Sequence, residues 1–278
     1  MLKPEELCEL VNFAREIRKK TLYMIGKLGV GHIGGALSIA DILALLYGKE
    51  MRYDPEKPQW TERDLLVLSK GHAGPALYSA LAIKGFFPIT WLDTLNQGGT
   101  SLPSHCDRNR TPGIDMTTGS LGQGLSAACG LALGRKIDGS DAKVFCIIGD
   151  GECDEGQNWE AAMFAAQFRL VNIIAFMDFN KMQIDGTIDQ ILSLGDIEGK
   201  WKSFGWHVER CDGHDIGALH EAVCRANAQS ETPEGKPSMI ICDTLKGKGA
   251  AFCENKVENH NMAFNMETAN EAIAALGE

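Results

Sequence analysis

Two polar residues of the sequence, Asp150 and Asn180, could together bind a metal ion. Each lies just past the carboxyl end of an apolar segment that is predicted to form a buried strand, 143–148 and 171–177. Consecutive parallel strands are often neighbours in a sheet, so both side chains can reach one point beyond its edge. A carboxylate, an amide oxygen and a nearby backbone carbonyl are ligands suited to Mg²⁺ or Ca²⁺. The pair therefore predicts a cation site at this edge.

Glycines on either side of Asp150 indicate an anionic ligand beside that cation. Gly149 and Gly151 let a diphosphate approach the backbone, and a helix predicted at 155–168 would direct its positive end toward the anion. A Gly-Asp-Gly sequence alone is usually a turn, and an asparagine after a strand usually only terminates it. The occurrence of both together, 30 residues apart, makes the pattern specific.

The rest of the chain supplies the elements that such a site needs. Buried strands are predicted at 64–69, 143–148, 171–177 and 238–243, and helices at 4–27, 75–84, 155–168, 194–203 and 215–229. A further helix is expected to begin near Ser38, with Ser38 as its N-cap and Asp41 three residues later. This alternation predicts an α/β fold, a parallel sheet with helices on both faces, whose ligands bind beyond the carboxyl ends of the strands. No linker or repeat divides the sequence, so residues 1–278 are expected to form a single domain.

The charge and cysteine content exclude several classes of function. A net charge of −10 disfavours binding to nucleic acid or to a membrane surface, because both carry negative charge. None of the nine cysteines belongs to a C-x-x-C pair, so we expect reduced thiols in a cytoplasmic protein rather than a zinc ribbon. The sequence has no apolar run of about 18 residues, so no membrane span is predicted.

The segments around Asp150 and Asn180 resemble the thiamine-diphosphate motif of transketolases. Gly149–Gly156 reads GDGECDEG, and Asp178–Gly186 reads DFNKMQIDG. Three more segments resemble motifs of the same family: Val30–Gly34 (VGHIG), Ser69–Ala73 (SKGHA) and Thr117–Gly124 (TTGSLGQG). The similarity covers essentially the whole chain, from about residue 10 to 265.

This resemblance implies that the ligand is thiamine diphosphate, clamped by a Mg²⁺ or Ca²⁺ ion. The implied metal ligands are the side chains of Asp150 and Asn180 and the main-chain carbonyl of Met182. The residues implied to contact the cofactor are Gly119, Leu121, Gly122, Gln123, Gly149, Asp150, Gly151, Glu152, Asn180 and His72. Taken without the resemblance, residues 119–123 could equally be the closely packed start of a helix.

The resemblance also assigns catalytic roles to histidines and to one glutamate. The implied catalytic residues are His32, His72, His105, His260 and Glu155. Imidazole can hydrogen-bond sugar hydroxyls and transfer protons near neutral pH. Asn261 follows His260 where the family usually has glycine. Glu155 would lie at a subunit interface and couple two cofactor sites, or it would simply stabilise the start of a helix.

Two further interpretations concern the remaining histidines and a glycine pattern. The other histidines are interpreted as structural: His207, His214 and His220. Gly29–Gly34 fits the dinucleotide-binding pattern G-x-G-x-x-G, but it follows a helix rather than a strand. We therefore interpret it as a loop around His32.

The position of the cofactor motif suggests that a partner chain is needed. In transketolases a glutamate from a separate pyrimidine-binding domain activates the cofactor, and this sequence ends at Glu278 before such a domain. The resemblance implies the N-terminal section of a split transketolase, which acts with a separate C-terminal section and with a second copy of itself. The implied reaction transfers a two-carbon ketol unit from a ketose or ketose phosphate to an aldose or aldose phosphate.

Alternatives remain open at this stage. One is another thiamine-diphosphate enzyme, such as the alpha subunit of a 2-oxoacid dehydrogenase or a deoxyxylulose-phosphate synthase, although the histidine-rich loops favour transketolase. Another is a subunit that binds cofactor without turnover. Departures from the family pattern leave room for an unusual sugar, including a modified or sulfonated ketose, and they are Ser104, Cys106, Ser120 and Asn261.

Overall fold

The structure is a computed structural model that describes residues 1–277 of the 278-residue chain. Its main sheet consists of parallel strands in the order β2-β3-β4-β6-β5. These strands are β2 (Leu65–Leu68), β3 (Val144–Gly149), β4 (Ile173–Phe179), β5 (His207–Asp212) and β6 (Ser238–Asp243). A second, small antiparallel sheet pairs β1 (Val30–Gly31) with β7 (Met262–Ala263).

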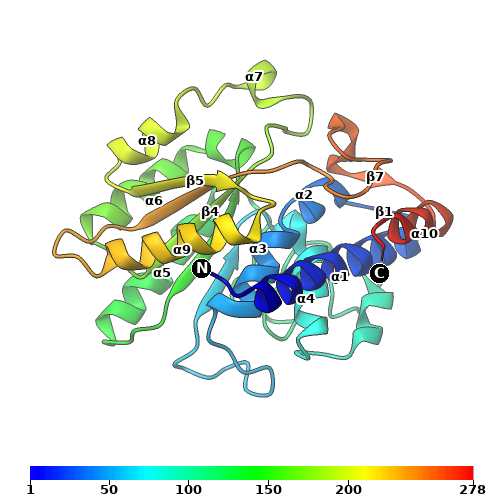
Figure 1. Cartoon of the computed structure of the whole chain (residues 1–278), viewed down its shortest axis with the longest axis horizontal. Helices are drawn as coiled ribbons and strands as arrows, with labels where there is room; N and C mark the ends of the chain where they lie inside the picture. The colour runs from blue at the N-terminus through cyan, green and yellow to red at the C-terminus, as the bar shows by residue number, and fades with distance from the viewer. Residues whose placement is uncertain (278) are drawn as a thin grey trace.

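Helices cover both faces of the main sheet (Figure 1). The α-helices are α1 (Pro4–Leu28), α2 (Ile33–Leu37), α3 (Ala40–Leu45), α4 (Gly74–Ile83), α5 (Gln123–Ile137), α6 (Gly156–Gln167), α7 (Ile188–Ile191), α8 (Ile197–Ser203), α9 (Ile216–Ser230) and α10 (Met266–Ala275). Shorter helical turns are η1 (Leu46–Glu50), η2 (Gly71–Ala73), η3 (Ile89–Thr94), η4 (Gly151–Asp154) and η5 (Val257–His260). Among the described helices, none is long and apolar enough to cross a membrane.

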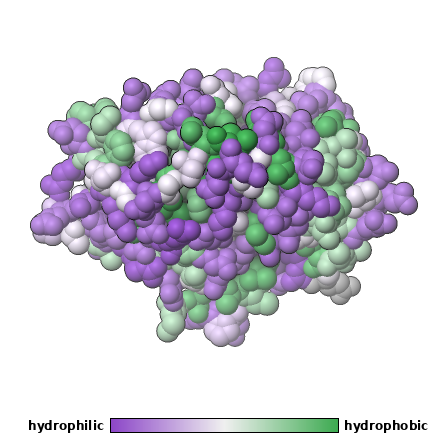
Figure 2. All heavy atoms as spheres, turned by 90° about the horizontal axis from the view of Figure 1, so that it is seen from above, coloured by the Kyte–Doolittle hydropathy of each residue, from purple (hydrophilic) through white to green (hydrophobic). Residues whose placement is uncertain are grey.

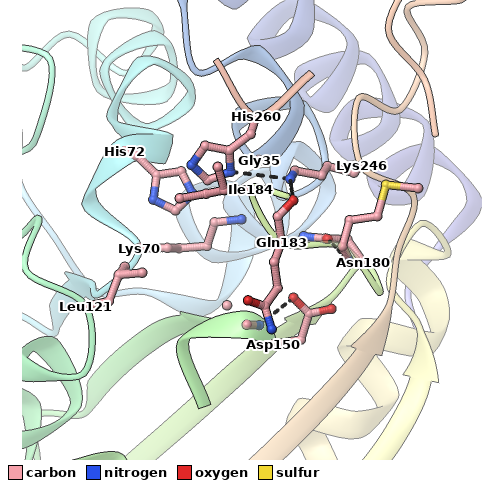
Figure 3. Close-up of a pocket in the computed structure, with 13 residues that line it drawn as sticks. Gly35, Lys70, His72, Leu121, Asp150, Asn180, Gln183, Ile184, Lys246 and His260 are labelled. Atoms are coloured by element: carbon pink, nitrogen blue, oxygen red, sulfur yellow. Dashed lines mark hydrogen bonds between the residues drawn. The ribbon is translucent and has the colours of Figure 1, made fainter. Parts of the chain in front are cut away.

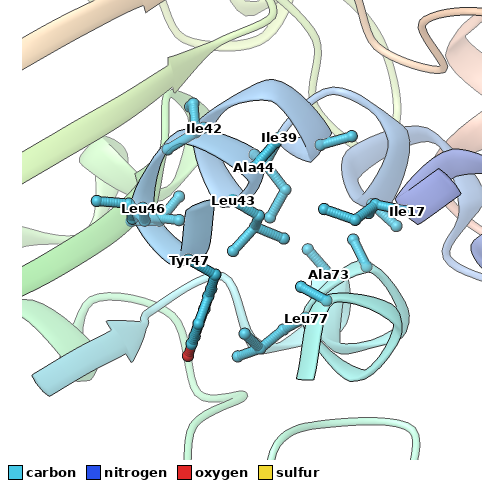
Figure 4. Close-up of a cluster of buried hydrophobic side chains, with 14 of the residues drawn as sticks. Ile17, Ile39, Ile42, Leu43, Ala44, Leu46, Tyr47, Ala73 and Leu77 are labelled. Atoms are coloured by element: carbon cyan, nitrogen blue, oxygen red, sulfur yellow. The ribbon is translucent and has the colours of Figure 1, made fainter. Parts of the chain in front are cut away.

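Alternate residues of each central strand are buried in different hydrophobic cores. Phe145 and Ile147 of β3 face a core shared with α1, α3, α4 and α9, whereas Cys146 faces a core shared with α5, α6 and α8. Figure 4 shows part of the first core, to which α1 contributes Ile17 and α3 contributes Leu43. Successive side chains of a strand point to opposite faces, so a sheet covered on both sides requires continuously apolar strands.

The predicted α/β fold with a parallel sheet is confirmed. Each of the four predicted strands is present, with ends that differ from the prediction by at most two residues. β3 and β4 are direct neighbours, and Gly149 pairs with Asp178 in their register. The turn after β3 and the loop after β4 therefore leave the sheet at the same edge, as the site prediction required.

The sequence patterns predict neither β5 nor α10. β5 is an edge strand with the sequence HVERCD, and its partly exposed charged residues lack the apolar run of a buried strand. α10 buries mainly alanine against α1, which leaves little hydrophobic signal. A Cβ at Gly26 of α1 would lie 2.6 Å from the Cβ of Ala269 in α10, so this packing depends on small side chains.

The helix predicted near Ser38 is present as α3, but the predicted N-cap role of Ser38 is wrong. Ser38 ends α2, and α3 begins at Ala40 without a side-chain cap. The Ser38 hydroxyl instead donates a hydrogen bond to Asp178 Oδ2 at 2.7 Å, and Asp41 pairs with Arg18. Buried charged groups elsewhere in the fold thus compete successfully for polar side chains that would otherwise cap a helix.

Asp41 is the centre of a buried ion network that joins α1, α3 and the loop before α9. Arg18 donates to both carboxylate oxygens of Asp41, at 3.0 and 2.5 Å, and His214 Nδ1 lies 2.8 Å from Oδ2. Burial raises the pKa of Asp41, but His214 and Arg18 outweigh it and the pKa is lowered overall. His214 Nε2 accepts a hydrogen bond from the Leu245 N–H at 2.9 Å, which supports a structural role for this histidine.

We expect Asp41→Asn to lower the free energy of unfolding by about 2–3 kcal/mol, because it leaves the Arg18 charge buried without its counterion. Urea denaturation followed by circular dichroism measures this change. Asp141→Asn is a matched control, since Asp141 pairs with Arg52 but its side chain is 80% exposed, and a loss of no more than about 1 kcal/mol is expected. Equal losses in the two variants would contradict the importance of the buried network.

Candidate active site

A pocket opens at the carboxyl edge of the main sheet, among the loops that follow β2, β3, β4 and β6 (Figure 3). We call it the main pocket, and its lining residues are Gly35, Lys70, His72, Leu121, Gly149, Asp150, Gly151, Asn180, Met182, Gln183, Ile184, Lys246 and His260. The structure thus brings together the three predicted metal ligands, two of the predicted histidines and the glycines beside Asp150.

Asp150 is a buried carboxylate at the floor of the main pocket, with a relative exposure of 1%. Its Oδ1 accepts a hydrogen bond from the Gly151 N–H at 2.8 Å, and its Oδ2 accepts one from the Lys181 N–H at 2.5 Å. Burial, together with the nearby charge of Asp178, raises the pKa of Asp150 from 3.8 to about 7. No lysine or arginine side chain pairs directly with Asp150 in the described part of the chain, so a bound cation would stabilise its charged form.

Asn180 and Met182 place two more oxygen atoms at the same pocket. Asn180 Nδ2 donates to Asp178 Oδ2 at 2.9 Å, and its Oδ1 accepts from the Met182 N–H at 3.1 Å. Residues 1–277 contain no cluster of three His, Cys, Asp or Glu side chains arranged to bind a metal, in keeping with a predicted set that includes a single carboxylate. Carboxylate, amide and carbonyl oxygens are a donor set that fits Mg²⁺ or Ca²⁺.

Two glycines keep the walls of the main pocket open. A Cβ at Gly151 would lie 2.7 Å from Gln183 Cγ, and one at Gly35 would lie 3.1 Å from both Lys70 Nζ and His72 Nε2. Side chains at these positions would occupy space beside Asp150 and beside the histidines. The absence of a Cβ therefore allows an anionic ligand to approach the backbone closely.

A buried ion pair, Lys70 with Asp178, lies beneath the main pocket and is not singled out by the sequence patterns. Lys70 is 1% exposed and Asp178 is fully buried, and Lys70 Nζ donates a hydrogen bond to Asp178 Oδ2. Asp178 also accepts hydrogen bonds from Ser38 and from Thr244, at 2.7 and 2.5 Å. Burial raises the pKa of Asp178, but Lys70, Thr244 and Ser38 together outweigh burial and the pKa is lowered overall.

Lys246 is a second lysine of the main pocket that the sequence patterns do not predict as a site residue. Its Nζ lies 3.2 Å from the Gln183 carbonyl oxygen and 3.3 Å from His260 Nδ1 (Figure 3). Burial and the nearby charge of Lys70 lower the pKa of Lys246 to about 8. Lys246 lies three residues beyond β6, so the same strand-end argument that identified Asp150 would have found it.

The four predicted histidines form one cluster. The ring centre of His32 lies 5.5 Å from that of His72, 5.4 Å from that of His105 and 5.4 Å from that of His260. Burial is the largest cause of the lowered pKa of each, to about 4 for His32 and about 3 for His260. All four imidazoles are therefore neutral at pH 7 and can both donate and accept hydrogen bonds.

A smaller side cavity lies on the other side of this cluster. It is lined by Leu28, Val30, Gly31, His32, Pro75, Leu95, Asn96, Ser104 and Asn261. His72 and His260 line the main pocket while His32 lines the side cavity, so the cluster forms a wall between them. Two departures from the family pattern, Ser104 and Asn261, thus lie together at the side cavity with polar groups that suit a hydroxylated ligand.

Glu152 lies outside the main-pocket lining, and its contact with the cofactor stays a prediction. It is 2% exposed and accepts hydrogen bonds from the Ser69 hydroxyl at 2.5 Å, the Gly122 N–H at 2.9 Å and the Gly149 N–H at 3.0 Å. Because its carboxylate is fully engaged and outside the main-pocket lining, Glu152 positions the loop before α5 against the end of β3.

The remaining predicted residues do not line the main pocket. A Cβ at Gly119 would lie 3.1 Å from His105 Cδ2, so this glycine lets His105 join the cluster. Gly122 precedes α5 with φ 85°, and Gln123 lines a separate surface cavity. Glu155 is exposed at the start of α6 and makes no capping hydrogen bond with its side chain.

The sequence matches a family model described as transketolase, thiamine diphosphate binding domain, over residues 11–278. A 6-deoxy-6-sulfo-D-fructose transketolase subunit from Clostridium sp. (strain MSTE9) is 57% identical over 272 residues, which cover 98% of each chain. An apulose-4-phosphate transketolase subunit from Actinobacillus succinogenes is 39% identical over 91% of this chain and 90% of the relative. Both relatives are named as transketolase subunits, which favours transketolase over the other thiamine-diphosphate enzymes considered above.

Solved structures extend the similarity to the fold. The transketolase from Leishmania mexicana superposes with a TM-score of 0.90 at 28% identity, covering 97% of this chain and 41% of that one. The Campylobacter jejuni transketolase gives a TM-score of 0.87 at 30% identity, covering 98% of this chain and 43% of that one. The chain spans less than half the length of these solved transketolases but nearly all of its two subunit relatives. It belongs to the transketolase family and corresponds to that family's thiamine diphosphate binding domain.

Proposed function

We propose that residues 1–278 act as one cofactor-binding domain of a split transketolase, which transfers a two-carbon ketol unit from a ketose to an aldose. The observation that carries this proposal is that an oxygen donor set lines one pocket together with His72 and His260, which belong to a cluster of four neutral histidines. The first group suits a metal and a diphosphate, and the second suits a sugar.

Asp150, Asn180 and the Met182 carbonyl would hold Mg²⁺ or Ca²⁺, and the glycine-lined wall would accept the diphosphate. Thiamine diphosphate, when bound, supplies a nucleophilic carbon and stabilises negative charge on the transferred unit. Asp150 supplies the negative charge that the metal requires. Gly149 and Gly151 present backbone next to it, and Lys246, which also lines the main pocket, offers a positive charge.

His32, His72, His105 and His260 would orient the donor sugar and move protons on its hydroxyl groups. Neutral imidazoles can accept a proton from one hydroxyl while donating a hydrogen bond to another. The Lys246–His260 contact leaves His260 Nδ1 as the acceptor, since an ammonium group can only donate. His260 Nε2 then carries the proton, which makes it a donor toward a ligand.

We expect His32→Asn to lower kcat/KM by about 10- to 100-fold while the Kd for thiamine diphosphate changes little, because His32 lies among the other three imidazoles and outside the main-pocket lining. The wild-type activity should not fall through protonation of His32 until the pH approaches 4, its lowered pKa. Steady-state kinetics and a cofactor titration separate the two effects. His207→Asn is the control, since His207 contacts Glu209 away from the pocket. An equal loss in both variants would refute the role of His32.

The chain also exposes apolar surface that a partner would cover. Ile184 lines the main pocket and is nevertheless 61% exposed. Met163 of α6 is 53% exposed and Phe168, directly after this helix, is 46% exposed, and a Cβ at Gly130 of α5 would meet no neighbour. Figure 2 shows hydrophobic groups reaching the surface between hydrophilic ones. Such surface supports contact with a C-terminal, pyrimidine-binding chain that supplies the activating glutamate and with a second copy of this chain.

Two finer proposals concern Glu155 and the compartment. Glu155 is exposed at the start of α6, beside Gly122, where a second copy could meet it and couple the two cofactor sites. All nine cysteines are free thiols, which supports a reducing, cytoplasmic location. The acidic net charge of −10 supports the absence of nucleic-acid and membrane-surface partners.

We propose a sulfonated ketose as the donor substrate. The relative at 57% identity is named for 6-deoxy-6-sulfo-D-fructose, whereas the relative named for apulose 4-phosphate is 39% identical. Sulfonate and phosphate are both tetrahedral anions, so they share recognition by positively charged groups. The polar residues of the side cavity, Asn96, Ser104 and Asn261, offer hydrogen bonds to hydroxyl groups of the sugar.

The decisive experiment is a transketolase assay with thiamine diphosphate and Mg²⁺, using this chain alone and mixed with its candidate partner chain. Donors would be 6-deoxy-6-sulfo-D-fructose, fructose 6-phosphate and apulose 4-phosphate, with an aldose phosphate as acceptor. We expect activity only in the mixture and the highest kcat/KM with the sulfonated ketose. Activity of the single chain would refute the need for a partner, and a preference for a phosphorylated donor would refute the substrate assignment.

A further inference from the structure

A cysteine, a histidine and a glutamate form a hydrogen-bonded chain between α9 and η1, outside the main-pocket lining. Cys224 Sγ lies 3.6 Å from His220 Nε2, and His220 Nδ1 lies 2.6 Å from Glu50 Oε1. Cys224 and His220 are four residues apart on α9, so they share one face of that helix. Glu50 is the last residue of η1, so its contact with His220 joins η1 to α9.

The contacts determine which ring nitrogen carries the proton. A carboxylate can only accept hydrogen bonds, so His220 Nδ1 carries a hydrogen that it donates to Glu50. In the neutral imidazole, Nε2 then presents its lone pair to the Cys224 thiol. Glu50 and His220 are each only 11% exposed at the side chain, which holds the ring in this orientation. The arrangement is that of a nucleophile, a base and a group that orients the base.

The thiol end of this group is open to solvent, while the base is not. Cys224 is exposed, as is Cys8, whereas Cys106, Cys129, Cys146, Cys153, Cys242 and Cys253 are buried. Cys8 differs from Cys224 in its partner, because its sulfur accepts a hydrogen bond from Asn12 Nδ2 at 3.7 Å and no base is bonded to it in residues 1–277. Lys49 lies near Cys224, but it forms an ion pair with Glu6, whose Oε1 is 2.6 Å from Lys49 Nζ. The chain thus offers two exposed thiols, of which one has a base.

We propose that Cys224 is a modification site that reacts with low-molecular-weight disulfides by thiol–disulfide exchange. His220 Nε2 takes the thiol proton while Cys224 Sγ attacks one sulfur of the disulfide. The bond between Sγ and that sulfur forms as the disulfide bond breaks, and the departing sulfur carries away the bond's electron pair. The proton held by His220 then passes to the departing thiolate. Cys224 ends as a mixed disulfide, and the other half of the reagent leaves as a free thiol.

Glu50 acts on this reaction through His220, as a positioning residue. Its carboxylate orients the ring and stabilises the positive charge that His220 gains on taking the proton. Glu50→Gln keeps an acceptor for Nδ1 but removes that charge, so the reaction should slow without losing the orientation. None of the three residues lines the main pocket or the side cavity, so the site is separate from the proposed active site.

The test is the rate of labelling of each cysteine in the full chain at pH 7 by dithiodipyridine, a neutral disulfide whose reaction the acidic surface does not repel. Quenching at intervals and peptide mass spectrometry give the rate at every cysteine. We expect Cys224 to react at least about 10-fold faster than Cys8, because general-base assistance commonly gives about 100-fold or more. In His220→Gln the rate at Cys224 should fall to that of Cys8, and in Glu50→Gln it should fall to an intermediate value.

Cys8 and the buried cysteines serve as internal controls for the fold. In a variant whose fold is intact, Cys8 is labelled at the wild-type rate and the buried thiols stay unlabelled. In a variant whose fold is disturbed, Cys8 and the buried cysteines would all be labelled faster. If Cys224 reacts no faster than Cys8 in the wild-type chain, the proposal is wrong. The same conclusion follows if His220→Gln and Glu50→Gln both leave the Cys224 rate unchanged in an intact fold.

Discussion

Asp150→Asn is expected to remove Mg²⁺-dependent binding of thiamine diphosphate while leaving the fold intact. Asp150 is the one carboxylate in the proposed ligand set, and the other two ligands are neutral oxygens of Asn180 and Met182. Loss of an outer-shell partner already costs about 10- to 100-fold in metal affinity, so loss of the charged ligand itself should cost more than about 100-fold. That factor corresponds to at least about 2.7 kcal/mol of binding free energy.

The same substitution should cost the folded chain little. Asp150 has no lysine or arginine bonded to it in the described structure, and burial together with Asp178 raises its pKa to about 7. Removing an unpaired buried charge therefore lowers the free energy of unfolding without cofactor by no more than about 1 kcal/mol. Calorimetric titration of the two-chain mixture with cofactor and Mg²⁺ measures the binding, and urea denaturation of the chain measures stability.

Asp189→Asn provides the matched control for this prediction. Asp189 is an exposed carboxylate of α7 that accepts a hydrogen bond from Ser193 and lies outside the main pocket. We expect it to bind cofactor like the wild-type chain. If Asp150→Asn binds cofactor as tightly as Asp189→Asn at the same Mg²⁺ concentration, the proposed metal site does not exist.

The position of Asp150 and Asn180 could be inferred from the sequence because it depends on local pattern and on one topological rule. Apolar runs identified β3 and β4, and the preference for adjacent parallel strands placed their ends together, as the pairing of Gly149 with Asp178 confirms. The resemblance to transketolases added the histidines. The ring centres of the other three histidines lie within 5.5 Å of that of His32. This arrangement depends on loops, which have no periodic sequence pattern from which it could be predicted.

What sequence reasoning missed depends on contacts between distant segments. Lys70 and Asp178 are 108 residues apart, and neither type of residue is expected in a buried position unless its partner is known. β5 is recognisable only as a neighbour of β6, since its side chains stay partly exposed. Ser38 fitted a helix cap locally, but Asp178 binds it from β4. In each case the deciding partner lies far away in the sequence.

Lys70→Met is expected to lower the free energy of unfolding by about 3–5 kcal/mol, because it leaves the carboxylate of Asp178 buried without a counterion. Asp178 keeps the hydrogen bonds from Ser38, Thr244 and Asn180, but these donors are neutral. In the wild-type chain the lowered pKa of Asp178 stabilises the fold above the unfolded-state pKa of about 3.8, and this stabilisation is lost as the pH falls through the folded-state pKa.

Lys246→Met is the control that shows whether removing any buried lysine lowers the stability as much as removing Lys70 does. Lys246 is 2% exposed, like Lys70, but it is bonded to the Gln183 carbonyl and His260 rather than to a carboxylate. Burial lowers its pKa to about 8, so the fold gains little from its charge. We expect Lys246→Met to change the free energy of unfolding by less than about 1 kcal/mol. Urea denaturation at pH 8 measures both variants.

The double variant Lys70→Met/Asp178→Asn tests whether the loss of stability in Lys70→Met arises from the unpaired charge of Asp178. Removing both charges leaves neutral groups with hydrogen-bond partners, so most of the stability lost in Lys70→Met should return, with a coupling energy of about 2–3 kcal/mol. Activity should not return, because Lys70 also lines the main pocket. Restored activity would show that Lys70 only supports the fold. A double variant no more stable than Lys70→Met would mean that Lys70 stabilises the loop after β2 by packing, and that the buried charge of Asp178 is tolerated without it.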